Sequence, residues 1–374
     1  MKKKGTIVLS AGGTGGHLFP AEALGAELTK RGYDVHLVTD ERAKRFVNGF
    51  DQEHLHEIRS ATVKSKNPVA LFKTLMALLK GVRQSRSLYR RIKPDLVVGF
   101  GGYPTLPPLY QAAKQGILTL IHEQNGVMGR ANKALAPKVN AIAGGFLQST
   151  DNYDNKLVVT GNPVRQAVID ASKNAYKMSS GKEPFHLLVF GGSQGASFFS
   201  QAMPDALKLL PDDLKKRLKL VQQARDDVDV LKEEYTQMGI DADIAPFFND
   251  MAEKIAQAHY IVARSGASTV SEIAVIGRPA LLIPYPYALD HDQAANAAAL
   301  AETGGVKVIA QSELSDKKLV DIIKAAMENP KMLATQAKAA KSASYLDATQ
   351  KLANLAEGLI LGKTVEDLKK EIAS

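Results

Sequence analysis

The sequence of 374 residues contains no cysteine. This absence excludes disulfide bonds and thiolate metal sites, and it favours a chain that works in a reducing compartment. Long apolar runs are also missing. No stretch of about 18 uncharged apolar residues occurs, so we expect no membrane-spanning helix. The remaining composition, with 45% hydrophobic and 23% charged residues, is that of an ordinary globular protein.

Acidic residues are missing from residues 59–93, although this segment holds ten Lys or Arg residues. The net charge of the chain is +9, and the excess lies in residues 1–162, with 23 basic and 12 acidic residues. Positive charge concentrated in one region indicates an anionic partner, either lipid headgroups or nucleic acid. The segment offers only Phe72 and Tyr89 for base stacking, so we expect no nucleic-acid partner.

A helix is predicted over Val69–Ile92, within the basic segment. At 3.6 residues per turn its large apolar side chains form one stripe. Packing of that stripe on a sheet would explain the stripe but not the basic residues, whereas an anionic membrane surface explains both. We therefore predict peripheral membrane binding through an apolar set and a basic set: Phe72, Leu75, Met76 and Leu79, with Lys73, Lys80, Arg83 and Arg86.

Short apolar runs alternate with helical patterns twice along the chain. Such alternation predicts an α/β protein with parallel sheets covered by helices on both faces. The length suits two domains, which we place at residues 1–162 and 163–344, with a C-terminal helical stretch, residues 345–374, that can pack back onto the first. The strand-like runs are Thr6–Ser10, Val35–Thr39, Leu96–Gly99, Ile117–Ile121, Leu157–Thr160, His186–Phe190, Leu218–Val221, Tyr260–Ala263, Ala280–Pro284 and Val306–Ile309.

Each half opens with a strand, a glycine-rich loop and a helix. The loops are Ala11–His17 and Gly191–Gly195. Glycines let backbone N–H groups approach an anion, and the helix N-terminus adds a favourable dipole. The spacing of the first loop matches neither the dinucleotide fingerprint nor the P-loop. Because ligands of open parallel sheets bind beyond the carboxyl ends of the strands, two equivalent loops favour ligand sites over mere tight turns.

Six motifs follow one another along the chain, and in them it resembles the MurG-type N-acetylglucosaminyltransferases of the GT-B fold class. The motifs are Gly12–His17, Gly101–Pro104, His122–Gly126, Gly161–Arg165, Gly191–Ala196 and Arg264–Ile273. The resemblance implies two Rossmann-like domains facing across a cleft, the first meeting acceptor and membrane and the second binding UDP-GlcNAc. It implies inverting transfer of GlcNAc to the C4 hydroxyl of MurNAc in undecaprenyl-pyrophosphoryl-MurNAc-pentapeptide (lipid I), which gives lipid II for peptidoglycan synthesis.

The resemblance also implies roles for single residues. His17 is the leading candidate for the general base, and Glu123 is the other. Glu272 is expected to bind the ribose, and the backbone at Phe248 to read the uracil. The other expected substrate contacts are Thr14, Gly15 and Gly16 in the first loop; Ser193, Gln194 and Arg165 at the diphosphate; and Asn125, Gln293 and Asn296 at the sugar. Asp292 stands where the family usually has glutamine, and its carboxylate can also accept hydrogen bonds from sugar hydroxyls.

No metal or cofactor is expected, because the Ser193 loop, Arg165 and a helix dipole can stabilise the diphosphate. Asp290, His291 and Asp292 are ligand-type residues without an evident need for a cation. The expected partners are UDP-GlcNAc, the lipid-linked acceptor and an anionic membrane at its cytoplasmic face, and the resemblance allows wall-synthesis proteins as well. The alternatives are another GT-B UDP-sugar transferase, a UDP-GlcNAc 2-epimerase, or a binding module without catalysis. The basic apolar helix argues against an epimerase, whose substrate is soluble.

Overall fold

The computed structural model describes residues 3–12, 15–41, 50–61, 67–150, 152–225, 227–288 and 292–373, without the side chains of residues 193–196. The chain forms two compact units. The first comprises Met1–Arg165 and Asp347–Ser374, and the second comprises Gln166–Leu346. The last part of the chain therefore belongs to the first unit.

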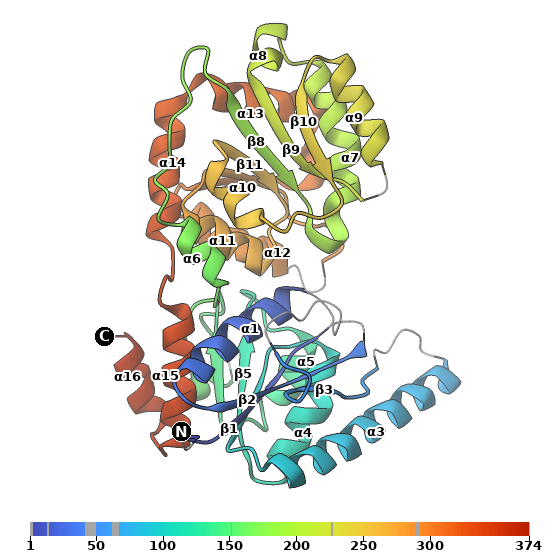
Figure 1. The fold of residues 1–374 in the computed structure, drawn as a ribbon, viewed down its shortest axis with the longest axis vertical. Coiled ribbons are helices and arrows are strands. Elements are labelled where there is room, and N and C mark those ends of the chain that lie inside the picture. The colour runs from blue at the N-terminus through green and yellow to red at the C-terminus, as the bar shows by residue number, and fades with distance from the viewer. Residues whose placement is uncertain are drawn as a thin grey trace. The chain divides into compact units, whose positions relative to one another are not determined.

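A seven-stranded parallel sheet forms the centre of the first unit (Figure 1), in the order β3-β2-β1-β4-β5-β6-β7. The direction of winding reverses between β1 and β4, and at such a switch point the loops beyond the carboxyl ends of the strands diverge and leave room for ligands. The strands are β1 (Thr6–Ser10), β2 (Asp34–Thr39), β3 (Leu55–Glu57), β4 (Leu96–Gly99), β5 (Leu118–Glu123), β6 (Ala141–Gly144) and β7 (Leu157–Val159).

Helices cover both faces of this sheet. Side chains alternate between the faces of a strand, so Ile7 and Leu9 of β1 join one core with α1 and α15, while Val8 joins the other with α3 and α4. Leu352 and Leu355 of α15 are fully buried in the first of these cores, so the C-terminal helices complete the first unit. The helices are α1 (Gly15–Lys30), α3 (Pro68–Ile92), α4 (Leu106–Lys114), α5 (Arg130–Leu135), α15 (Ala348–Ile360) and α16 (Val365–Ala373).

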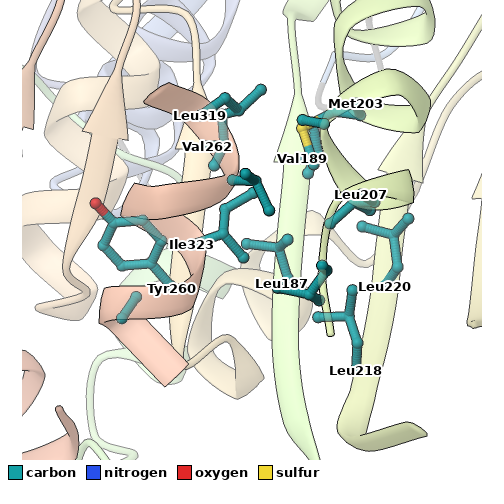
Figure 2. Packing of buried hydrophobic residues seen from close by; sticks show 14 of the residues in the cluster. Leu187, Val189, Met203, Leu207, Leu218, Leu220, Tyr260, Val262, Leu319 and Ile323 are labelled. Carbon is teal, nitrogen blue, oxygen red and sulfur yellow. The ribbon is translucent and has the colours of Figure 1, made fainter. Parts of the chain in front are cut away.

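The second unit has a six-stranded parallel sheet in the order β10-β9-β8-β11-β12-β13, with its own switch point between β8 and β11. Figure 2 shows its core, where Leu187 and Val189 of β8 face Met203 and Leu207 of α7. The elements are β8 (Phe185–Phe190), β9 (Leu218–Gln223), β10 (Asp241–Ala245), β11 (Tyr260–Ala263), β12 (Ala280–Leu282), β13 (Val306–Val308), α6 (Gln166–Ala171), α7 (Gly192–Lys208), α8 (Asp212–Arg217), α9 (Val228–Gln237), α10 (Met251–Gln257), α11 (Ala267–Ile276), α12 (Asp292–Ala301), α13 (Asp316–Glu328) and α14 (Pro330–Ser342).

The prediction of two parallel-sheet α/β domains is confirmed. Every predicted strand is present, with ends shifted by at most two residues. Three strands were missed, namely β3, β6 and β10, because each is short or carries charged residues in place of an apolar run. Across the described ranges, no helix combines the length and the apolar character needed to cross a membrane.

Candidate functional site

The loop after β1 brings backbone donors to the carboxyl edge of the first sheet. Helix α1 begins at Gly15, so the N–H groups of Gly15 and Gly16 lie in its first turn and have no acceptor within the helix. Gly12 is tightly enclosed, since a Cβ added there would lie 2.9 Å from Pro104 Cγ. Thr14, a predicted substrate contact, lies outside the described residues.

His17 follows this loop on α1 and is half-buried. Its Nδ1 lies 3.2 Å from the carbonyl oxygen of Gly12. Because a carbonyl oxygen only accepts, Nδ1 carries the proton in the neutral ring and Nε2 carries the lone pair. Desolvation lowers the pKa of His17, while Glu123 and the Gly12 carbonyl act in the opposite direction. The imidazole is therefore uncharged at neutral pH, with Nε2 able to accept a proton.

The loop after β4 packs against the His17 ring. Gly101 and Gly102 both have positive φ, +86° and +76°. A Cβ added at Gly101 would lie 3.4 Å from His17 Nε2, and one at Gly102 would lie 3.5 Å from Nδ1 of the same ring. Side chains there would be strained and would crowd the imidazole, which accounts for two consecutive glycines.

Glu123, the other candidate base, is buried at the end of β5. Its Oε1 accepts hydrogen bonds from the backbone N and the Nδ2 of Asn125, at 3.1 and 3.0 Å. Its Oε2 accepts from Gly129 N and Asn132 Nδ2, at 2.9 and 2.8 Å. Four donors thus converge on one carboxylate, and this arrangement suits an organiser of the loop after β5 better than a proton acceptor. The same bonds hold Asn125, the predicted sugar contact.

A buried polar network connects the loops after β4, β5 and β7. Gln124 Nε2 donates to the Phe100 carbonyl at 2.9 Å and lies 3.1 Å from His122 Nδ1, while His122 Nε2 lies 3.2 Å from the Gly161 carbonyl. Asn162 Nδ2 donates to the Gln124 carbonyl at 3.0 Å. His122 therefore carries its proton on Nε2, and burial lowers the pKa of this imidazole to about 4.

The side chains of this network, those of His122, Gln124 and Asn162, belong to motifs of the sequence, yet no role was predicted for them. The signal that could have found them is their position, because each lies near the carboxyl end of a buried strand. Arg165, the predicted phosphate contact, ends the first unit. Its guanidinium lies 4.3 Å from the centre of the Phe19 ring on α1, so it is held near the helix that follows the first glycine loop.

The second unit repeats the strand, glycine loop and helix at its own switch point. Helix α7 starts at Gly192, which has φ +63° and donates its backbone N–H to Gln223 Oε1 at 3.1 Å. Gln223 in turn donates to the Pro246 carbonyl at 3.2 Å. The loops after β8, β9 and β10 are therefore connected. The side chains of Ser193 and Gln194 lie outside the described residues, so their predicted contacts stay predictions.

Arg264, which sequence reasoning did not single out, anchors the loop after β11. Its guanidinium donates to the carbonyls of Ile283 and Pro284 at 3.1 and 3.2 Å and to Gln311 Oε1 at 2.6 Å. The rings of Phe198 and Tyr285 also lie against it, 4.7 and 5.4 Å away. Burial lowers the pKa of Arg264 to about 10, so it stays charged at neutral pH and holds three loops together.

The predicted donor contacts follow this anchor. Glu272 lies in the second turn of α11 and is 7% exposed. Gln293 Oε1 accepts from Tyr285 N at 2.9 Å, and Asn296 Nδ2 donates to the Ser265 carbonyl at 3.3 Å. These amides connect α12 to the loops after β11 and β12, and their expected contacts with the sugar stay predictions. Asp292 begins α12 and is half-buried, whereas Asp290 and His291 lie outside the described residues.

Phe248, predicted to lie near the uracil, is buried after β10 with the Lys254 ammonium 4.6 Å from its ring centre. Its neighbour Phe247 is 62% exposed. The exposed ring in this segment is therefore the one before the predicted residue.

The predicted membrane residues lie together on α3, the long helix along the outside of the first unit (Figure 1). Phe72, Leu75, Met76 and Leu79 are 63, 53, 46 and 44% exposed. The buried residues of this helix, Gly81, Ser85, Leu88 and Tyr89, all lie in its second half. The alternative that the apolar stripe packs on the sheet is therefore wrong. An open groove of about 770 Å³ lies beside the stripe, lined by Arg59, Phe72, Lys73, Met76, Ala77, Lys80, Arg83, Gln84 and Ser87.

Comparison with known families agrees with this geometry. The Glycosyltransferase family 28 N-terminal domain matches residues 7–144, and the family's C-terminal domain matches residues 186–352. The chain belongs to glycosyltransferase family 28. The first matched range lies within the first unit, and the second covers most of the second unit and ends in the C-terminal segment of the first. Each range contains one of the glycine loops.

Individual members of the family show which of its enzymes this chain resembles in sequence and structure. It is 59% identical over 372 residues, 99% of this chain and 98% of the other, to the UDP-N-acetylglucosamine--N-acetylmuramyl-(pentapeptide) pyrophosphoryl-undecaprenol N-acetylglucosamine transferase of Brucella suis biovar 1. The crystal structure of Acinetobacter baumannii MurG superposes with a TM-score of 0.75 and 28% identity, covering 94% of this chain and 99% of that one. The resemblance to MurG-type enzymes is thus confirmed.

A crystal structure of a UDP-N-acetylglucosamine 2-epimerase is also similar, with a TM-score of 0.67, 13% identity, and coverage of 96% of each chain. At that identity the likeness shows the fold alone. It explains why the fold does not separate a transferase from an epimerase.

Proposed function

We propose that this protein transfers GlcNAc from UDP-GlcNAc to the C4 hydroxyl of MurNAc in lipid I, giving lipid II with inversion at the anomeric carbon. The observation that carries the proposal is the 59% identity, over 99% of the chain, to a transferase named for this donor and acceptor. The arrangement around His17 supports it, because a neutral imidazole with its Nε2 lone pair lies at the carboxyl edge of the first sheet.

The reaction is a single displacement. The C4 oxygen of the acceptor attacks the anomeric carbon while the bond from that carbon to the β-phosphate oxygen breaks, and UDP leaves with the electron pair. His17 Nε2 takes the proton of the attacking hydroxyl. Its Nδ1–H remains bonded to the Gly12 carbonyl, which keeps the ring oriented. Glu123 favours the imidazolium electrostatically while its own oxygens hold the loop after β5.

The second unit binds the donor in this proposal. Backbone N–H groups at the start of α7 and the helix dipole stabilise the diphosphate as charge develops on it. Glu272 accepts hydrogen bonds from the ribose hydroxyls, and Gln293 and Asn296 meet the sugar. No divalent cation is needed, since these groups and Arg165 carry the electrostatic work. In this proposal, residues at the carboxyl edge of the first sheet act on the acceptor, and residues at the carboxyl edge of the second sheet bind the donor.

The first unit also meets the membrane in this proposal. The exposed stripe of α3 supports peripheral binding at the cytoplasmic face, where an undecaprenyl-linked acceptor presents its headgroup. Lys73, Lys80 and Arg83 line the groove beside the stripe, and basic residues near an anionic surface each contribute roughly 1 kcal/mol. The interaction with wall-synthesis proteins stays a prediction.

The proposed function is tested with UDP-GlcNAc labelled in the sugar and a lipid-linked muramyl pentapeptide. The label is expected to enter the lipid fraction, with one UDP released per sugar, at a rate that excess EDTA leaves unchanged. Formation of free or UDP-linked ManNAc with an unlabelled lipid fraction would instead identify an epimerase. Loss of transfer on chelation would contradict the metal-independent mechanism.

A further inference from the structure

Three of the eight histidines gather at one place on the first sheet, and none of the three takes part in the proposed transfer chemistry. His36 lies on β2. His54 directly precedes β3, and His56 is the middle residue of β3. Strands β2 and β3 pair in parallel, with Val38 opposite His56. Because side chains alternate along a strand, Asp34 and His36 point to the same face of the sheet as His54 and His56.

The polar atoms of this group converge. Asp34 Oδ1 lies 3.0 Å from His54 Nε2, and Asp34 Oδ2 lies 3.6 Å from His36 Nε2. One ligand atom from each of these three residues lies within 4.8 Å of the others. Ligands of a tetrahedral zinc ion, with bonds of about 2.0 Å, lie roughly 3.3 Å apart. Small side-chain rotations therefore bring the three atoms to coordination distance.

A fourth side chain, that of His56, contacts His36 on the nitrogen that does not face Asp34. His56 Nε2 lies 3.0 Å from His36 Nδ1. When His36 donates its Nδ1–H to His56, its Nε2 lone pair faces Asp34 and His54. Metal-binding histidines usually donate their second N–H to such a partner, which fixes the tautomer. The rings of His36 and His54 are 4.8 Å apart between centroids, so both nitrogens are presented from adjacent strands.

The cluster is partly exposed to solvent, and its carboxylate is already paired with the ammonium group of a lysine. The side chains of His54 and Asp34 are 29 and 20% exposed, and that of His36 is 9% exposed. The ammonium group of Lys3, 58% exposed, is paired with Asp34 Oδ1. It lies against the carboxylate oxygen that also faces His54.

We propose that Asp34, His36 and His54 bind one divalent transition-metal ion, with His56 orienting His36. Two imidazoles and one carboxylate favour Zn²⁺, Ni²⁺, Cu²⁺ or Co²⁺ over Mg²⁺ and Ca²⁺, which prefer oxygen ligands. Neutral His54 needs only to move its proton from Nε2 to Nδ1, and the remaining positions are open to water. The bound ion joins β3, the edge strand of the sheet, to β2.

This site is separate from the proposed transfer chemistry. Asp34 is the first residue of β2, so it lies at the amino edge of the sheet, whereas the glycine loop and His17 follow the carboxyl edge. Asp34 and His36 lie five and three residues before the end of β2, and a strand rises about 3.3 Å per residue, which places the ion roughly 10 to 16 Å from that edge. We therefore expect the ion to stabilise the first unit and to leave transfer unchanged.

The test is titration calorimetry of the tag-free, chelator-treated full chain with ZnCl₂. One Zn²⁺ per chain is expected, accompanied by a rise in melting temperature that EDTA reverses, and excess Mg²⁺ should not compete. His54→Ala and Asp34→Asn should abolish this binding. His56→Ala should weaken it about 10-fold or more. Lys3→Ala, an exposed change, should tighten it because the competing ammonium is removed.

The matched control is His186→Asn, which replaces a half-buried histidine of the second unit. This variant should bind Zn²⁺ as the parent chain does. Circular dichroism checks that each variant is folded. Absence of saturable binding in the parent chain, or equal affinity in the parent, His54→Ala and Lys3→Ala, overturns the proposal. Transfer activity does not enter these measurements, so failure of the metal site and failure of the proposed function are distinguishable.

Discussion

At the scale of single residues, the two candidate bases differ in what surrounds them. The Glu123 carboxylate accepts four hydrogen bonds, whereas the His17 ring is oriented through Nδ1. The neutral His17 ring carries a lone pair on Nε2, whereas both Glu123 oxygens order the loop after β5, so this arrangement favours His17 as the base. The sequence alone left both open, because adjacency to a strand end does not reveal how many donors a carboxylate meets.

His17→Ala is expected to lower kcat by about 10²- to 10⁴-fold, with little change in the Michaelis constant for UDP-GlcNAc. The neutral imidazole is the active form, so the parent rate should fall as pH drops through the lowered pKa of His17. That acidic limb should start below the ordinary histidine value of about 6.5 and be absent from the variant. Steady-state rates from pH 5 to 9 measure both.

Glu123→Gln is the comparison for this experiment. The amide NH₂ of the glutamine would face donors that the carboxylate now accepts from, so the loop after β5 should lose order and the rate should fall. The acidic limb of the pH profile should persist. An unaltered acidic limb in His17→Ala, lost instead in Glu123→Gln, would assign the base to Glu123.

His122 links protonation to stability. Its pKa is about 4 in the folded chain because of burial and about 6.5 when unfolded. The unfolded state therefore binds more protons between these values, and folding free energy is lost as pH falls from 6.5 to 4, by roughly 1.4 kcal/mol per pH unit for this group. Above pH 6.5 the contribution is fully present.

His122→Gln keeps an amide able to donate to the Gly161 carbonyl but has nothing to titrate. Its unfolding free energy should therefore depend less steeply on pH, by about one proton, over the same window. Hydrogen exchange of amides in β5 at several pH values measures this for the first unit alone. Equal slopes for the parent and the variant would show that His122 is not the group that titrates.

At the scale of elements, α3 is where the sequence was most informative. The helix was predicted over Val69–Ile92 and extends over Pro68–Ile92. The apolar stripe lies in a segment, residues 59–93, with ten basic residues and no acidic one. Burial in a globular core does not explain that charge, and the structure leaves the stripe exposed. Charge composition, which tertiary packing does not alter, made this prediction possible.

Replacing Lys73, Lys80, Arg83 and Arg86 together with Gln should weaken co-sedimentation with anionic liposomes strongly at about 0.15 M salt, since each charge contributes roughly 1 kcal/mol. Binding of UDP-GlcNAc should be unchanged. The matched control replaces Lys317, Lys318, Lys331 and Lys338, four exposed lysines of the second unit, and should sediment as the parent does. If both quadruple variants bind liposomes equally, net charge rather than this face of α3 governs association.

The short strand β3 shows where prediction from sequence fails. Only Leu55–Glu57 form it, and its apolar content is too low to signal a strand. Without β3 there was no reason to place His54 and His56 beside Asp34 and His36, although their spacing of two is visible in the sequence. Contacts between strands depend on register, which only the folded sheet provides.

At the scale of the whole molecule, repetition made the architecture predictable. Two rounds of strand, glycine loop and helix predicted two parallel sheets, and both show the same winding about their switch points. The part that could not be predicted is the buried polar scaffold, such as Arg264 with its carbonyl partners and the Gln124 network. Such side chains satisfy backbone groups that become unpaired only once the loops have their final form.

The central claim is inverting transfer of GlcNAc to the muramyl C4 hydroxyl, and the most direct test is the chemical structure of the lipid product. The purified, tag-free chain is incubated with UDP-GlcNAc and lipid-linked muramyl pentapeptide, and the released disaccharide is analysed by mass spectrometry and by the anomeric proton coupling in NMR. The account predicts one added GlcNAc, joined by a β-1,4 linkage. An α linkage, attachment at another hydroxyl, or an unmodified acceptor would contradict it.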